Sequence, residues 1–448
     1  MLDQSFSASN FRKIYDIENR LGNYLESDLF PEIEKQSRLI QVSKKNLRLL
    51  KKERELYLPK EYEERKEKLK IEIEDLENRK ETMLKFELEK ASIAVGMKNF
   101  SFGITKVDIG TPKQVFVAER NPATYFALKQ VQHNIRRLYK VKQGNRHHIV
   151  CQLRELLGDK LPKYIIKTDI SSFYESIPRR LILRKLNDDP LLTQTSKRII
   201  SRVLFEYGQK TGNETGLPRG IGISAYLAEL YMRDIDRSIR NFPGVLYYAR
   251  YVDDMFIIYC PPPNVGTSQF RRTVTAVLRD RGLTRNREKT KIITIDSDRN
   301  FMVEYLGYRF DIQGGSVVLR MTKKKKERYK RRIDLSIDDY NKQSRRSEKR
   351  ARRLLEKRIR FLAGNTRLVN NKKNVVSGIY FSNSLLSDAR DLKGLDAYLH
   401  NVINTIPSNR LKQRLLANSF EHSFQTRKYF KFTTQELSDI VEVWKNVT

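Results

Sequence analysis

Apolar residues in the first 95 positions follow a helical spacing in an otherwise very polar sequence. The apolar residues after Glu61 are mostly three or four residues apart: Leu69, Ile73, Leu76, Met83 and Phe86. This spacing predicts an amphipathic helix that lies on its own core, or alternatively one strand of a short coiled coil. Pro59 is expected to separate it from a preceding helical stretch.

Residues 96–315 show a different pattern. Short apolar runs rich in β-branched and aromatic residues alternate with helical stretches. The run 114–117 predicts a strand, and residues 125–139, 193–207 and 225–241 predict helices. A loop of turn-forming residues, 212–220, separates the last two helices. The alternation predicts a mixed α/β or α+β domain.

From about residue 316 the pattern becomes helical again and strongly basic. Between Arg320 and Arg360 there are 19 Lys or Arg residues and 6 Asp or Glu residues, a local excess of 13 positive charges. A solvated helix face or a localisation signal is one interpretation. The interleaved Tyr329 and Tyr340 favour a surface that contacts nucleic-acid phosphates.

Composition supports a folded protein with a polyanionic partner. The hydrophobic fraction is 39%, and the net charge is +34. Nucleic acid is the leading candidate for the partner and an anionic membrane surface is the alternative. No apolar run approaches the roughly 20 residues that span a bilayer. The two cysteines, Cys151 and Cys260, argue against a disulfide framework, and the N-terminus lacks a signal-peptide pattern, so a cytoplasmic location is expected.

Two adjacent carboxylates, Asp253 and Asp254, lie between two strand-like runs, which predicts a hairpin with acid at its tip. A third, Asp169, ends another apolar run about 84 residues upstream. Neighbouring carboxylates repel one another unless they share a cation. Three of them on adjacent strand ends are therefore a ligand set for two Mg²⁺ ions and in-line phosphoryl transfer.

Five sequence blocks, taken in order, resemble the palm of reverse transcriptases. The blocks are Lys167-Thr168-Asp169-Ile170-Ser171-Ser172-Phe173-Tyr174, Gly216-Leu217-Pro218-Arg219-Gly220 with Ser224, Tyr251-Val252-Asp253-Asp254, Asn286-Arg287-Glu288-Lys289-Thr290-Lys291 and Tyr305-Leu306-Gly307-Tyr308. Each block alone is weak evidence for this family, but the order of all five over residues 164–310 is specific to it.

The resemblance implies an α+β right-hand polymerase fold of fingers, palm and thumb with helical N-terminal and C-terminal extensions. Residues 1–95 would form a helical N-terminal extension. Residues 96–315 would form the fingers and palm, and residues 316–448 the basic helical thumb and C-terminal region.

The resemblance also assigns catalytic and metal-binding roles. Asp169, Asp253 and Asp254 would hold two Mg²⁺ ions, with the backbone carbonyl of Ile170 as a further ligand. One ion would activate the primer 3′-hydroxyl and the other would neutralise the triphosphate. Lys289 matches the lysine that relieves the leaving pyrophosphate.

Other residues match positions around the nucleotide. Tyr174 stands where an aromatic ring clashes with a 2′-hydroxyl and so favours deoxynucleotides. Gly220 permits close backbone approach, and Arg219 replaces the frequent glutamine that would contact the nucleotide. Arg120 and Arg146 are the best candidates in the fingers for binding the triphosphate.

The last block matches the primer grip. The residues Tyr305, Leu306, Gly307 and Tyr308 would form a hairpin near the primer backbone, and Gly307 would allow the bend. An ordinary core hairpin is the alternative interpretation.

The function implied is an RNA-directed DNA polymerase that uses dNTPs and releases a DNA product. A Cys/His endonuclease module is not evident, and Val376-Ser377-Gly378 only approaches the Val-Thr-Gly signature of retron enzymes. The remaining pattern resembles bacterial abortive-infection and defence-associated reverse transcriptases of the unknown group, which are related to retron and group II intron enzymes. That resemblance implies antiviral defence, a structured non-coding RNA as template, and a homo-oligomer or companion protein. A retron or mobile-intron enzyme, or a catalytically idle nucleic-acid-binding scaffold, remains the alternative.

Overall fold

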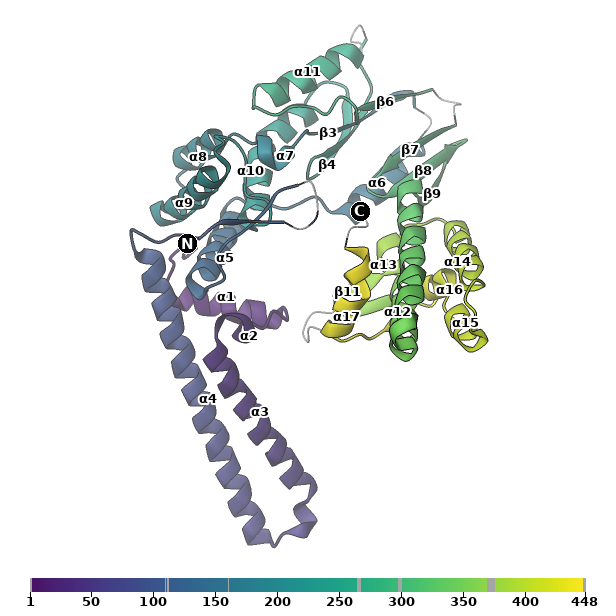
Figure 1. Cartoon of the computed structure of the whole chain (residues 1–448). Coiled ribbons are helices and arrows are strands. Elements are labelled where there is room, and N and C mark those ends of the chain that lie inside the picture. The colour runs from purple at the N-terminus through teal and green to yellow at the C-terminus, as the bar shows by residue number, and fades with distance from the viewer. Residues whose placement is uncertain are drawn as a thin grey trace. The chain divides into compact units, whose positions relative to one another are not determined.

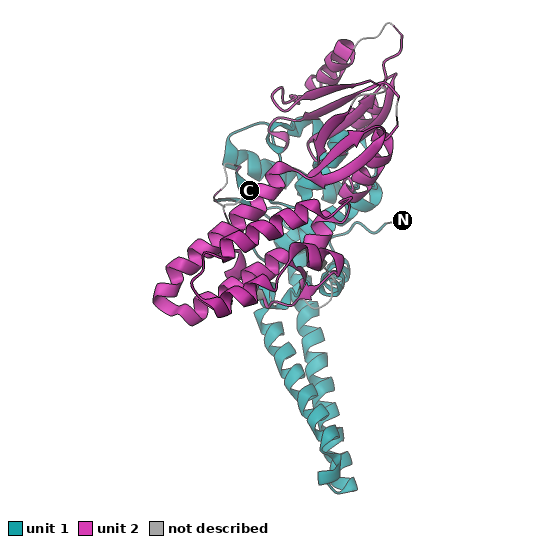
Figure 2. Ribbon diagram, turned by 90° about the vertical axis from the view of Figure 1, so that its right-hand side faces the viewer, with its two compact units in different colours: residues 1–108, 114–142, 174–232 teal, residues 109–113, 143–173, 233–448 magenta. Residues whose placement is uncertain are grey.

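The computed structural model describes residues 2–108, 110, 113–159, 161–263, 267–296, 300–368 and 375–445 (Figure 1). They divide into two compact units, each assembled from segments that are distant in the sequence (Figure 2). Unit 1 takes residues 1–108, 114–142 and 174–232, and unit 2 takes residues 109–113, 143–173 and 233–448. Helices and strands are mixed along the chain, which confirms the predicted α+β class.

Unit 1 is mainly helical. Its helical elements are α1 (Ala8–Arg20), α2 (Glu26–Leu29), α3 (Pro31–Lys52), η1 (Arg54–Leu56), α4 (Pro59–Gly96), α5 (Pro122–Leu138), α8 (Arg179–Asp188) and α9 (Gln194–Thr211). Two short strands, β1 (Thr105–Val107) and β2 (Val115–Val117), pair antiparallel. The helices α7 (Phe173–Ser176) and α10 (Ile223–Arg240) each begin in one unit and end in the other.

The helices α3 and α4 run side by side as a long hairpin (Figure 1). Pro59 is the first residue of α4, where its missing N–H costs nothing, so the predicted break is confirmed. α4 also packs on α1 and α5, as expected for an amphipathic helix on its own core. The predicted apolar face was wrong at Phe86, whose side chain is 56% exposed, because the buried positions there are Leu84 and Leu88.

A four-stranded antiparallel sheet lies at the centre of unit 2. Its strands are β3 (Lys163–Asp169), β4 (Val245–Tyr251), β5 (Asp254–Tyr259) and β6 (Lys291–Ile295), in the order β4-β5-β3-β6. Ile258 on β5 belongs to a core shared with α6 (Arg146–Leu157). The next residue, Tyr259, stacks on Phe270 of α11 (Thr267–Arg279) with ring centroids 4.3 Å apart. Alternate residues of β5 thus pack on different helices, as the two-residue period of a strand requires.

A second antiparallel sheet of unit 2 joins the core of α6. It consists of β7 (Phe301–Tyr305), β8 (Tyr308–Gln313) and β9 (Ser316–Met321). Val303, Phe310 and Leu319 are buried in this core together with Leu153 of α6. The sheet follows directly on the four-stranded one in the sequence.

The C-terminal part of unit 2 packs around the long helix α12 (Lys323–Ala363), which is interrupted at Ser347. The other elements are β10 (Asn365–Leu368), β11 (Val375–Gly378), α13 (Ile379–Asn383), α14 (Arg390–Ile403), α15 (Asn409–Leu416), α16 (Phe420–Gln425), β12 (Tyr429–Phe430), α17 (Thr434–Val441) and η2 (Glu442–Trp444). The sequence pattern did not predict the three strands, because they span only two to four residues each. α4 and α12 are long but highly charged, and no helix in the described ranges is both long and apolar enough to cross a membrane.

Candidate active site

The hairpin of β4 and β5 presents two adjacent carboxylates at its tip. Tyr251 pairs with Asp254, so Val252 and Asp253 form a two-residue turn. Val252 has a φ of +59°, which is a strained conformation for a β-branched residue. Arg250 Nη1 donates a hydrogen bond of 2.7 Å to the Val252 carbonyl and so holds the strained residue in place.

The end of β3 brings Asp169 to the same place. Asp169 and Asp254 are direct partners across the two strands, and such pairs project from the same face of a sheet. The Ile170 N–H donates to the Asp253 carbonyl at 3.2 Å, and the Asn286 N–H donates to the Asp169 carbonyl at 2.7 Å. The acidic residues predicted from remote parts of the sequence therefore lie on neighbouring backbone segments.

Burial and repulsion disfavour the charged forms of Asp253 and Asp254. Burial raises the pKa of Asp254 to about 6, opposed by Lys167 and reinforced by Asp169 and Asp253. Burial also raises the pKa of Asp253, with repulsion by Asp169 as the second cause. A nearby divalent cation would reverse both effects, because it favours the ionised carboxylates.

Lys289 reaches the acidic group from the segment that precedes β6. Its Nζ forms an ion pair with Asp169 Oδ2. This hydrogen bond raises the pKa of Lys289, so the ammonium stays protonated beside the carboxylate. A hydrogen bond of 2.8 Å between the hydroxyls of Thr168 and Thr290 fastens this segment to β3. The predicted catalytic lysine is thus in contact with a predicted metal ligand.

The carboxylate oxygens are suitable ligands for divalent cations, although they are not arranged as a complete coordination shell. The Asp169 Oδ1 atom is buried and has no hydrogen-bond partner among the residues that the structure describes. A buried carboxylate oxygen without a partner is costly, and a hard cation is the partner that such an oxygen prefers. Among the described residues, no three His, Cys, Asp or Glu side chains already form a metal cluster. Cation binding would therefore require local adjustment, including movement of Lys289 away from Asp169.

The raised pKa of Asp254 predicts an unusual dependence of stability on pH. The folded protein retains a proton that the unfolded chain releases, so without metal the free energy of unfolding falls as pH rises from about 4 to above 6. Asp254→Asn should remove this cost and stabilise the protein in EDTA at pH 7.5 by about 1–3 kcal/mol. Chemical denaturation at several pH values checks this. Asp188→Asn, at an exposed position of α8, is the control and should show no such gain; a destabilised Asp254→Asn protein at pH 7.5 would contradict the expectation.

An ion pair behind the hairpin was not predicted from the sequence. Arg250 Nε and Nη2 donate to the two carboxylate oxygens of Asp236 at 2.8 and 2.9 Å, and the Tyr248 hydroxyl donates to Asp236 at 2.7 Å. The Arg250 side chain is 5% exposed and that of Asp236 is 17% exposed. The only sequence signal was a charged residue inside an apolar strand next to the acidic turn.

The proposed primer-grip residues form a tight hairpin between β7 and β8. Leu306 and Gly307 make the turn, with φ values of +47° and +76°, as in a type I′ turn. Arg146 Nε donates to the Leu306 carbonyl at 2.9 Å, and its guanidinium lies 5.2 Å from the ring centroid of Tyr308. The structure thus places Arg146 on this hairpin, and its expected role at the triphosphate stays a prediction.

Unit 1 holds the other residues that were expected around the nucleotide. Arg219 forms a 3.0 Å ion pair with Glu175, and its guanidinium lies 4.9 Å from the ring centroid of Tyr174. The Leu217 N–H donates to the Tyr174 carbonyl at 2.7 Å. The predicted loop and the predicted aromatic residue are therefore in contact. Arg120, the second candidate in the fingers, is 71% exposed and pairs with Asp28 at 2.5 Å.

Gly220 is fixed by close packing rather than by the turn alone. Its φ is +103°, and a Cβ there would lie 2.4 Å from the Phe116 carbonyl oxygen. The Phe116 N–H donates to the Arg219 carbonyl at 2.7 Å, which holds β2 against the loop. The Ser224 hydroxyl closes the loop by donating to the Pro218 carbonyl at 2.7 Å. The close approach expected at this glycine is present.

The sequence of this region matches a known family. Residues 115–310 match the profile described as "Reverse transcriptase (RNA-dependent DNA polymerase)". The chain contains a reverse transcriptase domain. This range includes all five blocks described above, and the mixed fold agrees with a right-hand polymerase fold. Enzymes of this family generally use divalent metal ions.

Telomerases are among the solved structures that a structural comparison finds similar to this chain. Apo telomerase from Candida tropicalis has a TM-score of 0.39 and 12% identity, with 79% of this chain and 64% of that chain covered. Telomerase from Candida albicans in complex with the TWJ fragment of telomeric RNA has a TM-score of 0.31 and 10% identity, with coverage of 70% and 53%. The chain thus spans less than two thirds of these telomerase chains. A comparison with curated protein sequences gives no match.

Proposed function

We propose that this chain is an RNA-directed DNA polymerase that adds deoxynucleotides to a primer 3′ end. The observation that carries the proposal is the convergence of Asp169, Asp253 and Asp254 within a reverse transcriptase domain. Two Mg²⁺ ions bound by these carboxylates and the Ile170 carbonyl would activate the attacking hydroxyl and neutralise the triphosphate. The buried Asp169 Oδ1 atom, which lacks a hydrogen-bond partner within the described ranges, supports this assignment.

Side chains other than the three carboxylates would position the reactants. The protonated Lys289 would neutralise or protonate the leaving pyrophosphate, and its ion pair with Asp169 supports this role. The hairpin of Leu306 and Gly307, held by Arg146, would support the primer backbone. Tyr174 would exclude a 2′-hydroxyl, and Arg219, stacked on its ring, would contact the nucleotide.

RNA is the proposed template, supported by the family described as RNA-dependent and by the net charge of +34. The finer proposal is a bacterial antiviral-defence enzyme in the cytoplasm that copies a structured non-coding RNA, acting as a homo-oligomer or with a companion protein. It rests on the sequence resemblance. Sequencing the nucleic acid that co-purifies with the protein tests it: a dedicated structured RNA is expected, whereas an intron RNA would support a mobile-intron enzyme instead.

Template-directed incorporation tests the proposed activity. The protein is supplied with Mg²⁺, dNTPs and an RNA template annealed to a primer, and in parallel with its co-purified RNA. DNA complementary to the RNA is expected, with ribonucleotides used far less well because of Tyr174. Binding of RNA without any incorporation on either template would support the idle scaffold and overturn the proposal.

A further inference from the structure

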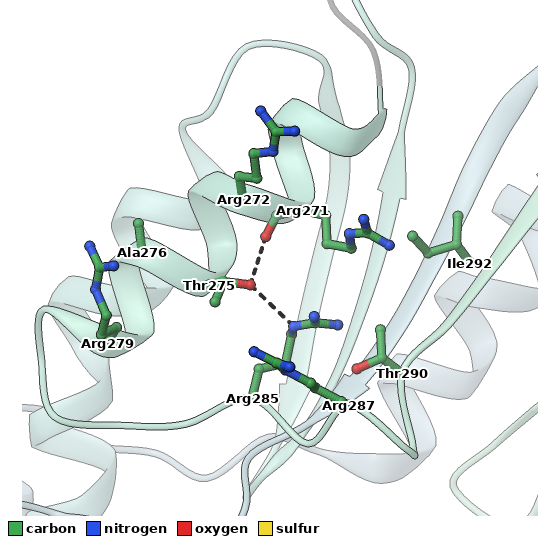
Figure 3. A pocket seen from close by; sticks show the side chains of 9 residues that line it. All are labelled: Arg271, Arg272, Thr275, Ala276, Arg279, Arg285, Arg287, Thr290 and Ile292. Carbon is green, nitrogen blue, oxygen red and sulfur yellow. Dashed lines mark hydrogen bonds between the residues drawn. The ribbon is translucent and has the colours of Figure 1, made fainter.

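A large pocket of unit 2 opens between α11 and the segment that leads into β6. Its volume is about 850 Å³, and nine residues line it (Figure 3): Arg271, Arg272, Thr275, Ala276, Arg279, Arg285, Arg287, Thr290 and Ile292. Five of the nine are arginines and none is acidic. This pocket, called the arginine pocket below, is not part of the acidic group.

The arginine pocket concentrates positive charge, and few carboxylates neutralise it. Arg279 pairs with Asp280 at 3.4 Å, but within the described ranges no carboxylate forms an ion pair with any of the other four arginines. Figure 3 shows the guanidinium groups of Arg271, Arg285 and Arg287 around one shared space. Burial, followed by repulsion from Arg271 and Arg287, lowers the pKa of Arg285. Like charges held this close destabilise the protein unless an anion is bound.

The local sequence builds this arrangement. Phe270, Val274 and Leu278 form the buried face of α11, which leaves the arginines on another face of the helix. The Thr275 hydroxyl donates to the Arg271 carbonyl at 2.8 Å and accepts from Arg285 Nε at 3.2 Å (Figure 3). Arg285 is therefore oriented before any ligand binds, and its remaining guanidinium donors make no hydrogen bond to another described residue.

We propose that the arginine pocket binds the phosphodiester backbone of a nucleic-acid strand, at a site separate from the catalytic carboxylates. Guanidinium groups match phosphate oxygens with paired hydrogen bonds, which lysine ammonium groups cannot do. The volume exceeds that of one phosphate, so several consecutive phosphates fit. No aromatic ring lines the pocket, and base stacking therefore plays no part.

The position of the pocket connects it with the proposed function. Thr290 lines the pocket and also bonds to Thr168, which precedes Asp169. A strand anchored here is held by the same segment that carries Lys289. The inference goes beyond the proposed polymerase activity, because it concerns binding alone and can be measured without catalysis.

Salt-dependent binding in EDTA tests the arginine pocket. The full chain is titrated with a labelled unstructured 20-nucleotide RNA, and with DNA of the same sequence, at several salt concentrations. The variant Arg271→Gln/Arg285→Gln/Arg287→Gln should bind at least one of the two strands more weakly. The slope of log K against log[salt] should become shallower by about 2, because each lost phosphate contact on a single strand contributes roughly 0.7. The strand that loses affinity identifies the source of the phosphates.

A matched control removes the same charge elsewhere. Arg20, Arg48 and Arg79 are exposed on α1, α3 and α4, and their triple glutamine variant should retain a steeper slope than the pocket variant. Equal slopes for wild type and pocket variant on both strands would overturn the proposal. The proposal would also be overturned if the pocket variant lost binding of labelled ATP in EDTA but bound both strands as wild type does. That result would indicate that the pocket binds a free nucleotide. The wild-type protein could fail to incorporate nucleotides while the pocket variant still binds nucleic acid more weakly than wild type. That result would count against the polymerase activity only.

Discussion

Replacing Asp169 by asparagine is expected to lower nucleotide incorporation by at least about 10³-fold, or about 4 kcal/mol in the activation free energy. Asparagine keeps the shape of the side chain but loses the charge and one ligand oxygen. It also removes the ion pair with Lys289 and the repulsion that raises the pKa of Asp253. Primer extension at saturating dNTP concentrations measures the effect as a fall in kcat.

The folded structure should survive this substitution. The backbone of Asp169 is held by its pairing with Asp254 and by the Asn286 N–H, neither of which involves the carboxylate. Circular dichroism and thermal unfolding check this directly. Asp188→Asn, on the exposed surface of α8, serves as the control and should keep full activity. An Asp169→Asn enzyme within about tenfold of wild type would mean that the carboxylate is not a ligand.

Replacing Arg250 by methionine is expected to destabilise the protein by about 3–5 kcal/mol. The change leaves the Asp236 carboxylate in a largely buried position, where the Tyr248 hydroxyl is its remaining hydrogen-bond donor among the described residues. It also releases the Val252 carbonyl, so the strained turn that carries Asp253 loses its support. Urea denaturation measures the loss, and activity should fall as well.

A double substitution separates the two causes. Arg250→Met combined with Asp236→Leu removes both charges, and replacing a buried ion pair by apolar residues is often neutral for stability. Most of the free energy of unfolding should return, while the turn still lacks its hydrogen bond and activity stays low. A single Arg250→Met variant within 1 kcal/mol of wild type would contradict the structural role of the pair.

The sequence predicted the elements of the site better than their surroundings. Alternation of apolar residues around Asp253 and Asp254 located the hairpin, and the order of the five blocks linked it to Asp169. These features depend on short-range patterns. The Arg250–Asp236 pair joins a strand to a helix, and nothing in the pattern of α10 distinguishes Asp236 from a solvated residue.

The other differences between the predictions and the structure arise from side-chain contacts between residues far apart in the sequence. Arg146 lies on the Leu306 turn, 160 residues away, which no local pattern indicates. The six arginines from Arg271 to Arg287 form a charge run in the sequence, but the gathering of five of them into a pocket depends on how α11 packs. The division into N-terminal extension, fingers with palm, and thumb stays a prediction.

The central position of β3 has a consequence for how this protein is made. β3 ends at Asp169, but its two neighbours in the sheet, β5 and β6, begin only at Asp254 and Lys291. At about 5–20 residues per second, a ribosome needs roughly 6–25 seconds to supply the second neighbour. Until β6 is made, the nascent chain carries an apolar strand with at least one unpaired edge. Newly made chains are therefore expected to depend on chaperones during synthesis.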